Sequence, residues 1–497
     1  MSKQYSLVYY ILTGILLSLQ IFTFAAAQDV ELSVKIDPEV RIASINGVYQ
    51  AGGSGLFRRN IGFADTVAGR TRLAERIVEL AAADRRGANR EIREIAPGEF
   101  VSDADLDQWS YRIDLSDDLS AGVSAHTTWL RRDIGVLMAE DLFPRMAASD
   151  RKISARITFD LPDGWDLLTT AKAGGRTIET DDLRAEIFAI GENWEMRRAS
   201  MSRMNVTIIR SGDWNFALAE AETAAEEILR ELTAVFGRPA AENVLIIFAP
   251  IPVEAGYGRW EAETRGSTVT IASSDMAFRT QSVQRMHEQL RHELFHLWMP
   301  NAMALEGGYD WFYEGFALYQ SLRTAVRLNG ISFDDMLDTI SRAYAIDRAQ
   351  QKRRPIVETA TDRWAGGLEV YARGLMVAFM CDAAMLSDSR GRESVETLLR
   401  EIFRKHAAPA PPADGNLAIT EAMRARRELG PIVERWIAGS EPPDLSDAMD
   451  ALGLELASRG RGERLYVVRR PNGNQRRLLD KLGYNNWRKA RKYQNAN

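Results

Sequence analysis

The first half of the chain alternates apolar and polar residues in the way that half-buried strands do. Near residue 30, "VELSVKID" alternates between apolar and polar side chains at successive positions. Further along, "WSYRIDL", "AHTTWL" and "ISARITFDLP" are rich in aromatic and β-branched residues. The stretch "DTVAGRTRLAERIVELAAADRRG" differs, because Leu73, Ile77 and Leu80 recur at three- and four-residue steps. The pattern therefore predicts a β-rich domain over residues 28–184 with one helical insertion.

A second unit with a mixed pattern is expected over residues 185–408. "MNVTIIR", "NVLIIFAP" and "GSTVTIAS" have the composition of strands, and "WNFALAEAETAAEEILRELTAVFG" has the period of a long helix closed by Gly237. From Met276 onward the apolar spacing is helical. The overall fold class predicted from these patterns is α+β.

Two further segments follow the second unit. The proline-rich run "HAAPAPPADG" predicts a loop or linker, after which residues 409–458 are expected to form a C-terminal helical segment. Residues 459–497 contain nine arginines and three lysines against Glu463 and Asp480, a net charge of +10. Such a basic run is usually a solvated end, so the tail is expected to be partly disordered.

The stretch "RHELFHLWMPN" carries the strongest chemical signal of the chain. Residues four apart lie on one face of a helix, so His292 and His296 can hold one metal ion. Pro300 is expected to end this helix at or near Met299. Glu293 lies about 100° around the helix and can reach a water on that metal, which is the H-E-x-x-H arrangement of a zinc peptidase.

A third protein ligand is expected from the helical stretch "YDWFYEGFALYQSLRTAVRL". Glu314 in this stretch follows His296 after 17 intervening residues, enough for a loop and a return. It would complete a His-His-Glu set for one Zn²⁺ per chain. The other three histidines lack ligand spacing and are expected to be structural or solvated: His126, His287 and His406.

These motifs resemble those of the zinc peptidases of the gluzincin type, which use two histidines and a distant glutamate. "HELFHLWMPN" with "FYEGFALY" carries the resemblance, and "VYARGLMVAFMCDAAML" and "SVETLLREIF" are most similar to the glycyl aminopeptidase family. The likeness is strong over residues 185–408, looser over 30–184 and absent in the tail. It implies a thermolysin-like catalytic domain behind the β-rich domain, and removal of N-terminal glycine or alanine.

The resemblance also assigns roles to individual residues. His292, His296 and Glu314 would bind zinc, and Glu293 would activate the water. Tyr371 in "VYARG" matches the tyrosine of a Y-x-K-G motif, and its hydroxyl would stabilise the oxyanion. The lysine of that motif is Arg373 here, so the positive charge is kept.

An aminopeptidase further needs a carboxylate for the α-ammonium of its substrate. In "GYGRWEAETRGSTVTI", Glu263 fits the family's spacing to the next strand, while Glu261 fits a glycine-led alignment. Glu263 is preferred and Glu261 stays open. The family's glycine pair is missing at this place, so two alternatives remain: a zinc endopeptidase acting on unfolded peptides, and a catalytically weak peptide-binding protein of the envelope.

The N-terminal segment and the net charge indicate the compartment and the partners of the protein. Lys3, an apolar run and "FAAAQD" have the layout of a secretory signal over residues 1–27, and an uncleaved membrane anchor is the alternative. The net charge of −6 leaves −16 on the chain outside the basic tail, which argues against nucleic acid as a partner. We therefore expect an exported, periplasmic or secreted protein that binds peptides, with a tail able to contact an anionic surface weakly.

Overall fold

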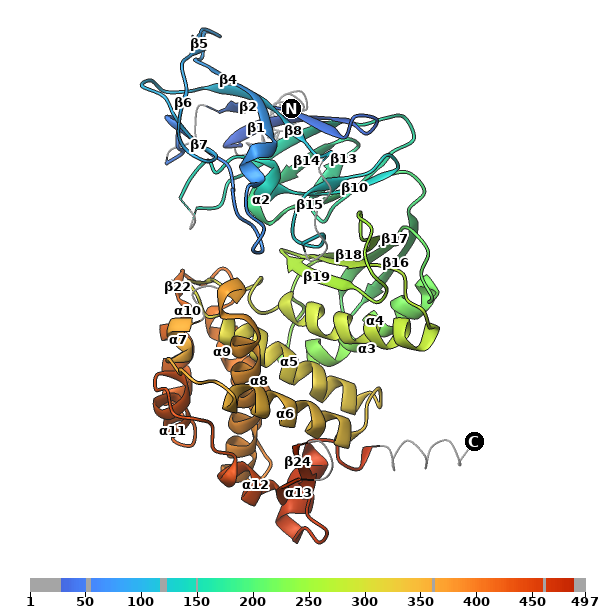
Figure 1. The fold of residues 1–497 in the computed structure, drawn as a ribbon, viewed down its shortest axis with the longest axis vertical. Helices are drawn as coiled ribbons and strands as arrows, with labels where there is room; N and C mark the ends of the chain where they lie inside the picture. Colours follow the sequence, from blue (N-terminus) through green and yellow to red (C-terminus); the bar gives the residue numbers. More distant parts are fainter. Residues whose placement is uncertain are drawn as a thin grey trace, which may run out of the picture.

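The computed structural model describes residues 28–50, 55–116, 123–148, 151–359, 363–458 and 462–486. The expected signal sequence and the last eleven residues of the basic tail lie outside the described residues. Figure 1 shows a β-rich N-terminal part, a smaller sheet in the middle and a helical lobe at the opposite end. This mixture of helix and sheet agrees with the expected α+β class.

The N-terminal domain is built around an eight-stranded sheet of order β13-β14-β11-β1-β2-β8-β4-β5. Its strands are β1 (Val30–Asp37), β2 (Ile42–Tyr49), β4 (Ile77–Ala83), β5 (Asn89–Arg90), β8 (Gln108–Asp114), β11 (Ala155–Asp160), β13 (Lys172–Gly174) and β14 (Thr177–Thr180). A three-stranded sheet lies beside it: β3 (Asn60–Gly62), β6 (Arg93–Ala96) and β7 (Glu99–Val101). Alternation along β1 buries every second side chain, so the sequence pattern is realised residue by residue.

The predicted helical insertion is wrong. Only a 3-10 turn, Leu73–Arg76, forms in that stretch, and it continues directly into strand β4. The pairing of β4 with β8 contains a bulge between Val78 and Ala81, where Glu79 has a φ of 56°. The bulge adds one residue and breaks the period of two, so Ile77 and Leu80 stand at the three-residue step that is typical of a helix.

A four-stranded sheet joins the N-terminal domain to the rest of the protein. It consists of β9 (Trp129–Leu130), β10 (Ile134–Met138), β12 (Asp166–Leu168) and β15 (Ile187–Gly191), and the short helix α2 (Ala139–Leu142) follows β10. One face packs in the N-terminal core, and the other packs against Ile209, Leu245 and Ile247 of the next sheet. Because β15 pairs with β10 and β12, the N-terminal domain extends past the expected boundary at residue 184.

The central five-stranded sheet has the order β16-β17-β18-β20-β19. Its strands are β16 (Glu195–Met201), β17 (Met204–Arg210), β18 (Asn243–Pro250), β19 (Trp260–Arg265) and β20 (Thr268–Ser273). Helices α3 (Leu218–Phe236) and α4 (Arg279–His296) cover one face of it. As predicted, Gly237 closes α3 in the left-handed conformation that glycine adopts without strain.

The helical lobe follows α4. Its helices are α5 (Asp310–Arg327), α6 (Phe333–Arg348), α7 (Ile356–Thr359), α8 (Arg363–Asp388), α9 (Val395–His406), α10 (Gly415–Arg424), α11 (Gly430–Ile432), α12 (Ser446–Leu452) and α13 (Gly473–Lys481), with a π-turn at Val433–Ile437. Strands β21 (Leu305–Glu306) and β22 (Ala413–Asp414) pair with each other, as do β23 (Leu454–Ser458) and β24 (Glu463–Val467). One continuous core runs from the central sheet to the end of α13.

The segment from residue 459 onward is not a separate tail as far as the structure describes it. Strand β24 pairs with β23 across the expected boundary, and Leu465, Leu478 and Leu479 are buried in the core of the lobe. The arginines gave this stretch its solvated appearance, but they lie on its outer side while the leucines face inward. Of the predicted tail, residues 462–486 are therefore part of the folded lobe.

Helix α8 is apolar enough from Gly367 to Asp388 to cross a membrane by length and composition alone. In the folded protein 83% of its most apolar window is buried. Its neighbours are the other helices of the lobe, so α8 is the central helix of a protein core rather than a surface facing lipid.

The burial of the C-terminal segment predicts its contribution to stability. Leu479→Ala should lower the free energy of unfolding of the lobe by about 2–5 kcal/mol, because it opens a cavity at a fully buried position. Leu417→Ala is the matched control: Leu417 is 56% exposed, and its loss should cost about 0.5 kcal/mol or less. Denaturant unfolding of both variants measures the difference, and equal midpoints would contradict the packing of α13.

Candidate functional site

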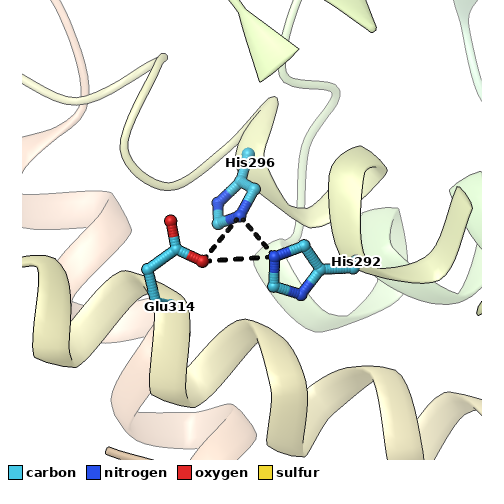
Figure 2. Close-up of side chains that lie close together, drawn as sticks. All are labelled: His292, His296 and Glu314. Atoms are coloured by element: carbon cyan, nitrogen blue, oxygen red, sulfur yellow. Dashed lines mark hydrogen bonds and ion pairs between the residues drawn. The ribbon is translucent and has the colours of Figure 1, made fainter. Parts of the chain in front are cut away.

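The three expected metal ligands converge from two helices. His292 and His296 project from the last turns of α4, and Glu314 projects from the first turns of α5 (Figure 2). The Nε2 atoms of the two histidines lie 3.1 Å apart, and Oε2 of Glu314 lies 3.2 Å from His292 Nε2 and 3.6 Å from His296 Nε2. Within the described residues, His292, His296 and Glu314 form the group of side chains that could hold a metal ion.

The spacing of these three atoms fits a tetrahedral metal ion. Ligand bonds of about 2.0–2.2 Å at tetrahedral angles place the ligand atoms about 3.3–3.6 Å from one another. The observed separations of 3.1, 3.2 and 3.6 Å lie close to that range. His296 Nδ1 also lies 2.9 Å from the carbonyl oxygen of Met299, to which it can donate, which leaves the Nε2 lone pair for a metal.

The ligand set is strongly coupled electrostatically. Burial lowers the pKa of the His296 imidazole, but the charge and hydrogen bond of the adjacent Glu314 carboxylate, the charge of Glu293 and the hydrogen bond to Met299 together outweigh this effect and raise the pKa to about 9. Burial raises the pKa of Glu314, but the two imidazoles outweigh it and hold that pKa well below its usual range. Without a metal, His296 therefore carries a proton that an incoming metal ion must displace.

Glu293 is buried beside the ligand set and is held by a neighbouring strand. Its carboxylate Oε2 accepts a hydrogen bond of 2.8 Å from the hydroxyl of Thr264 on β19, and that hydroxyl also lies 2.9 Å from the Glu293 carbonyl oxygen. The bond restrains the rotamer of the carboxylate. Glu293 lines the same cavity as the three ligands.

The residues after the second histidine shape the end of α4. The helix ends at His296 and continues as turns to Pro300, slightly before the predicted end at Met299. Trp298 is fully buried, stacks on Phe236 and donates from its indole nitrogen to the carbonyl of Arg238 at 2.8 Å. The tryptophan thus locks the end of α4 onto α3.

Asn301 fastens the same turn to the central sheet. Its amide nitrogen donates to the carbonyl oxygens of Thr264 at 3.0 Å and Gly266 at 3.2 Å. This contact holds β19 against the end of the ligand-bearing helix. The Trp and Asn of the sequence motif therefore position the metal helix and the strand that faces it.

Tyr371 reaches the cavity because α5 and α8 approach each other unusually closely. A Cβ atom on Gly315 would lie 2.2 Å from the backbone of Gly374, and one on Gly374 would lie 2.3 Å from the carbonyl oxygen of Trp311. Only glycine allows this backbone contact. It places Glu314, next to Gly315, and Tyr371, three residues before Gly374, around the same cavity.

The face of β19 that carries the two candidate amine-binding acids is turned toward the N-terminal domain. Alternate residues of a strand share a face, and the three on this face contact that domain. Glu261 accepts hydrogen bonds from the backbone N–H groups of Ser124 and Ala125 at 2.5 and 3.4 Å. Arg265 pairs with Glu140 at 2.8 Å. Glu263, between them, contacts His126 and lines the cavity.

Glu261 and Glu263 therefore occupy different environments. The carboxylate of Glu261 is buried and engaged by backbone amides, and Glu261 is absent from the cavity lining. The Glu263 side chain is partly exposed and belongs to the lining. The position favoured by the sequence is thus the one that faces the ligands.

His126 was expected to be structural or solvated, and the structure corrects this expectation, because the residue lies in the site. Its Nδ1 lies 2.7 Å from Oε2 of Glu263, and its side chain lines the cavity. The two residues are 137 positions apart, and "AHTTWL" contains no ligand spacing that would have revealed the contact. Thr264, Asn301 and Tyr313 were also missed.

The cavity that collects these groups has a volume of about 430 Å³. It is lined by His126, Ala262, Glu263, Thr264, His292, Glu293, His296, Pro300, Asn301, Tyr313, Glu314 and Tyr371. His287 and His406 are not part of it, in agreement with the expectation of structural or solvated side chains. Burial lowers the pKa of both of these imidazoles.

The charge coupling predicts how metal affinity depends on pH. Zinc binding to the metal-free protein should release protons at about pH 7, and its affinity should rise as the pH approaches 9, because the His296 proton then leaves more easily. Titration calorimetry in buffers of different ionisation enthalpy measures both effects. His292→Ala should abolish binding and His287→Ala, on the same helix, should preserve it; an affinity that is constant across this pH range would contradict the coupling.

No protein-family model matches the chain, and no curated protein matches it. Solved structures do. The aminopeptidase N family protein of Idiomarina loihiensis aligns with a TM-score of 0.71 at 13% identity, over 86% of this chain and 79% of its own. The M1 zinc metallopeptidase of Deinococcus radiodurans aligns with a TM-score of 0.57 at 14% identity, over 84% of this chain and 95% of its own.

A variant of the Deinococcus radiodurans enzyme was solved with the substrate Tyr-Ser-Ala, and it aligns equally well, with a TM-score of 0.57 at 15% identity. One neighbour is named as an aminopeptidase N family protein and the others as M1 zinc metallopeptidases, and none of these is described as a glycyl aminopeptidase. Identities this low establish a common architecture and no more. The chain thus has the fold of the aminopeptidase N-like M1 zinc metallopeptidases, from the β-rich N-terminal domain to the helical lobe.

Proposed function

We propose that the protein is a zinc-dependent aminopeptidase that removes small N-terminal residues, glycine or alanine, from peptides in an exported compartment. The observation that carries this proposal is the content of one cavity: a His-His-Glu triad, the carboxylate of Glu293 and, facing them, the carboxylate of Glu263. The fold shared with M1 zinc metallopeptidases supports the reaction class. The preference for glycine and alanine rests on the sequence resemblance alone.

The proposed chemistry assigns the proton transfers to Glu293. Zinc held by the triad would lower the pKa of a water molecule and polarise the scissile carbonyl. The Glu293 carboxylate accepts the proton of the attacking water and then delivers it to the leaving amine. Its hydrogen bond from Thr264 keeps the carboxylate oriented throughout.

Two further groups of the cavity serve the substrate. The hydroxyl of Tyr371 donates to the oxyanion that forms as the carbonyl is attacked. Glu263 binds the α-ammonium of the substrate through a charge-assisted contact. The position of β19 at the edge of its sheet supports a peptide substrate, because an extended chain can add to an edge strand.

The setting of the reaction is part of the proposal. Export follows from the layout of residues 1–27, and N-terminal sequencing of the mature protein tests it: a start at Gln28 supports cleavage. No nucleic acid is expected as a partner. The exposed arginines at positions 469, 470, 476 and 477 support weak contact with an anionic surface.

Substitution of the two groups that act on the reaction centre tests the mechanism. Glu293→Gln should reduce kcat by about 10²–10⁴-fold because the general base is lost. Tyr371→Phe should reduce kcat by about 10²–10³-fold, with little change in KM, because its donor acts on the transition state. Hydrolysis of glycyl- and alanyl-anilides, with zinc content by mass spectrometry, measures both. Normal turnover by a zinc-loaded Glu293→Gln variant would exclude the mechanism.

Substitution of the amine-binding acid separates an exopeptidase from an endopeptidase. Glu263→Gln should raise KM for peptides with a free N-terminus by about tenfold or more and should leave N-terminally blocked peptides as poor substrates. Glu261→Gln is the control on the same strand face; it should affect stability more than KM, because its partners are backbone amides. If the unmodified enzyme cleaves blocked and free peptides equally well, the endopeptidase alternative holds.

A further inference from the structure

A fully buried carboxylate contacts helix α8 two residues after Tyr371, through Arg373. Asp347, near the end of α6, has an exposed fraction of 0%. Its Oδ1 accepts a hydrogen bond of 2.8 Å from Nε of Arg373, and its Oδ2 accepts one of 2.7 Å from Nη1 of Arg353. From the sequence, Arg373 is recognisable only as a positive charge beside Tyr371.

The two arginines also contact backbone carbonyls of the segment that follows α6. Arg353 donates to the carbonyl oxygen of Asp347, and Nη1 of Arg373 donates to that of Arg354 at 2.7 Å. Removing an ionised carboxylate from water costs free energy, and this cost is offset only when charged groups and hydrogen-bond donors take the place of the water. The cluster Asp347–Arg353–Arg373 thus ties together α6, the segment after it and α8.

The place of this cluster on α8 matters because the helix is interrupted just before Tyr371. Gly367 has φ 54° and ψ −149°, which is not a helical conformation, so the regular helix starts only there. The first turn of a helix lacks part of its hydrogen bonding and frays readily. Tyr371 lies four residues after this break, and Arg373 lies two residues further along.

We propose that Asp347 and Arg373 are positioning residues for Tyr371: their buried ion pair fixes the N-terminal part of α8 and thereby holds the tyrosine hydroxyl at the place where the oxyanion forms. This inference rests on the proposed function and extends it to residues outside the cavity. The guanidinium of Arg373 forms its ion pair with the buried Asp347 and not with the substrate.

The guanidinium is suited to this task in a way that an ammonium is not. The planar guanidinium of Arg373 donates to Asp347 from one nitrogen and to the Arg354 carbonyl from another. Because the two nitrogens belong to one rigid plane, the directions of the two hydrogen bonds are fixed relative to each other. A lysine at this position can satisfy the carboxylate but cannot hold both partners in one plane. Arg373→Lys should therefore be a mild form of the same defect.

The test uses Asp347→Asn in the full-length, zinc-loaded protein. We expect kcat for alanyl-anilide to fall by about tenfold to a hundredfold, with KM within about twofold and zinc content near one per chain, because the misplacement affects the transition state. Asp338→Asn is the matched control: Asp338 lies on the same helix and also has two arginine partners, Arg342 on α6 and Arg464 on β24, neither of which belongs to α8. It should keep its kcat.

A second measurement shows whether the effect passes through Tyr371. In a Tyr371→Phe background, Asp347→Asn should lower kcat by less than about twofold further, because the group that it positions is already gone. An equal fall in both backgrounds, or an unchanged kcat in the single variant, would overturn the inference. If Asp347→Asn does not fold, Arg373→Lys takes its place in the same cycle. Full activity of Tyr371→Phe alone would instead refute the role of Tyr371 in the proposed function.

Discussion

The geometry of the site depends on one steric constraint, the contact between the backbones of α5 and α8 at Gly315 and Gly374. Neither position has room for a Cβ atom, so the two helices can lie this close only with glycine at both. Glu314 precedes one glycine and Arg373 precedes the other. A wider crossing would draw Glu314 away from the histidines of α4 and Tyr371 away from the cavity at the same time.

A second constraint comes from the alternation of β19. One face of this edge strand meets the N-terminal domain through Glu261, Glu263 and Arg265, while Thr264 on the other face holds Glu293. The strand therefore links the base to the domain that supplies His126. The cavity lies at a junction of two domains, which is a common location for binding sites.

The short-range features of the site were readable from the sequence. The four-residue spacing of His292 and His296 needs only one helix, and the helical spacing of apolar residues around Glu314 predicted a second helix that could carry the third ligand. Glycine at position 237 and the strand runs of the central sheet were likewise local signals. Each of these follows from propensity and periodicity over fewer than about 20 residues.

The features that the sequence did not reveal depend on distant contacts. His126 and Glu263 meet only after two domains have packed, and Asp347 and Arg373 meet only through the packing of α6 on α8. The bulge in β4 imitated a helical period, and the arginines after residue 459 concealed the leucines that pack inward. In all these cases tertiary structure decided what local pattern left ambiguous.

The packing of β24 on α6 has a consequence for the order in which the chain can fold. The backbone nitrogen of Leu465 donates to the hydroxyl of Ser341, 124 residues earlier, and the same strand pairs with β23. During synthesis α6 is therefore complete long before the strand that covers it, and its apolar surface stays open until the end of the chain emerges. A nascent or truncated chain that stops before residue 462 would present this surface to chaperones and proteases.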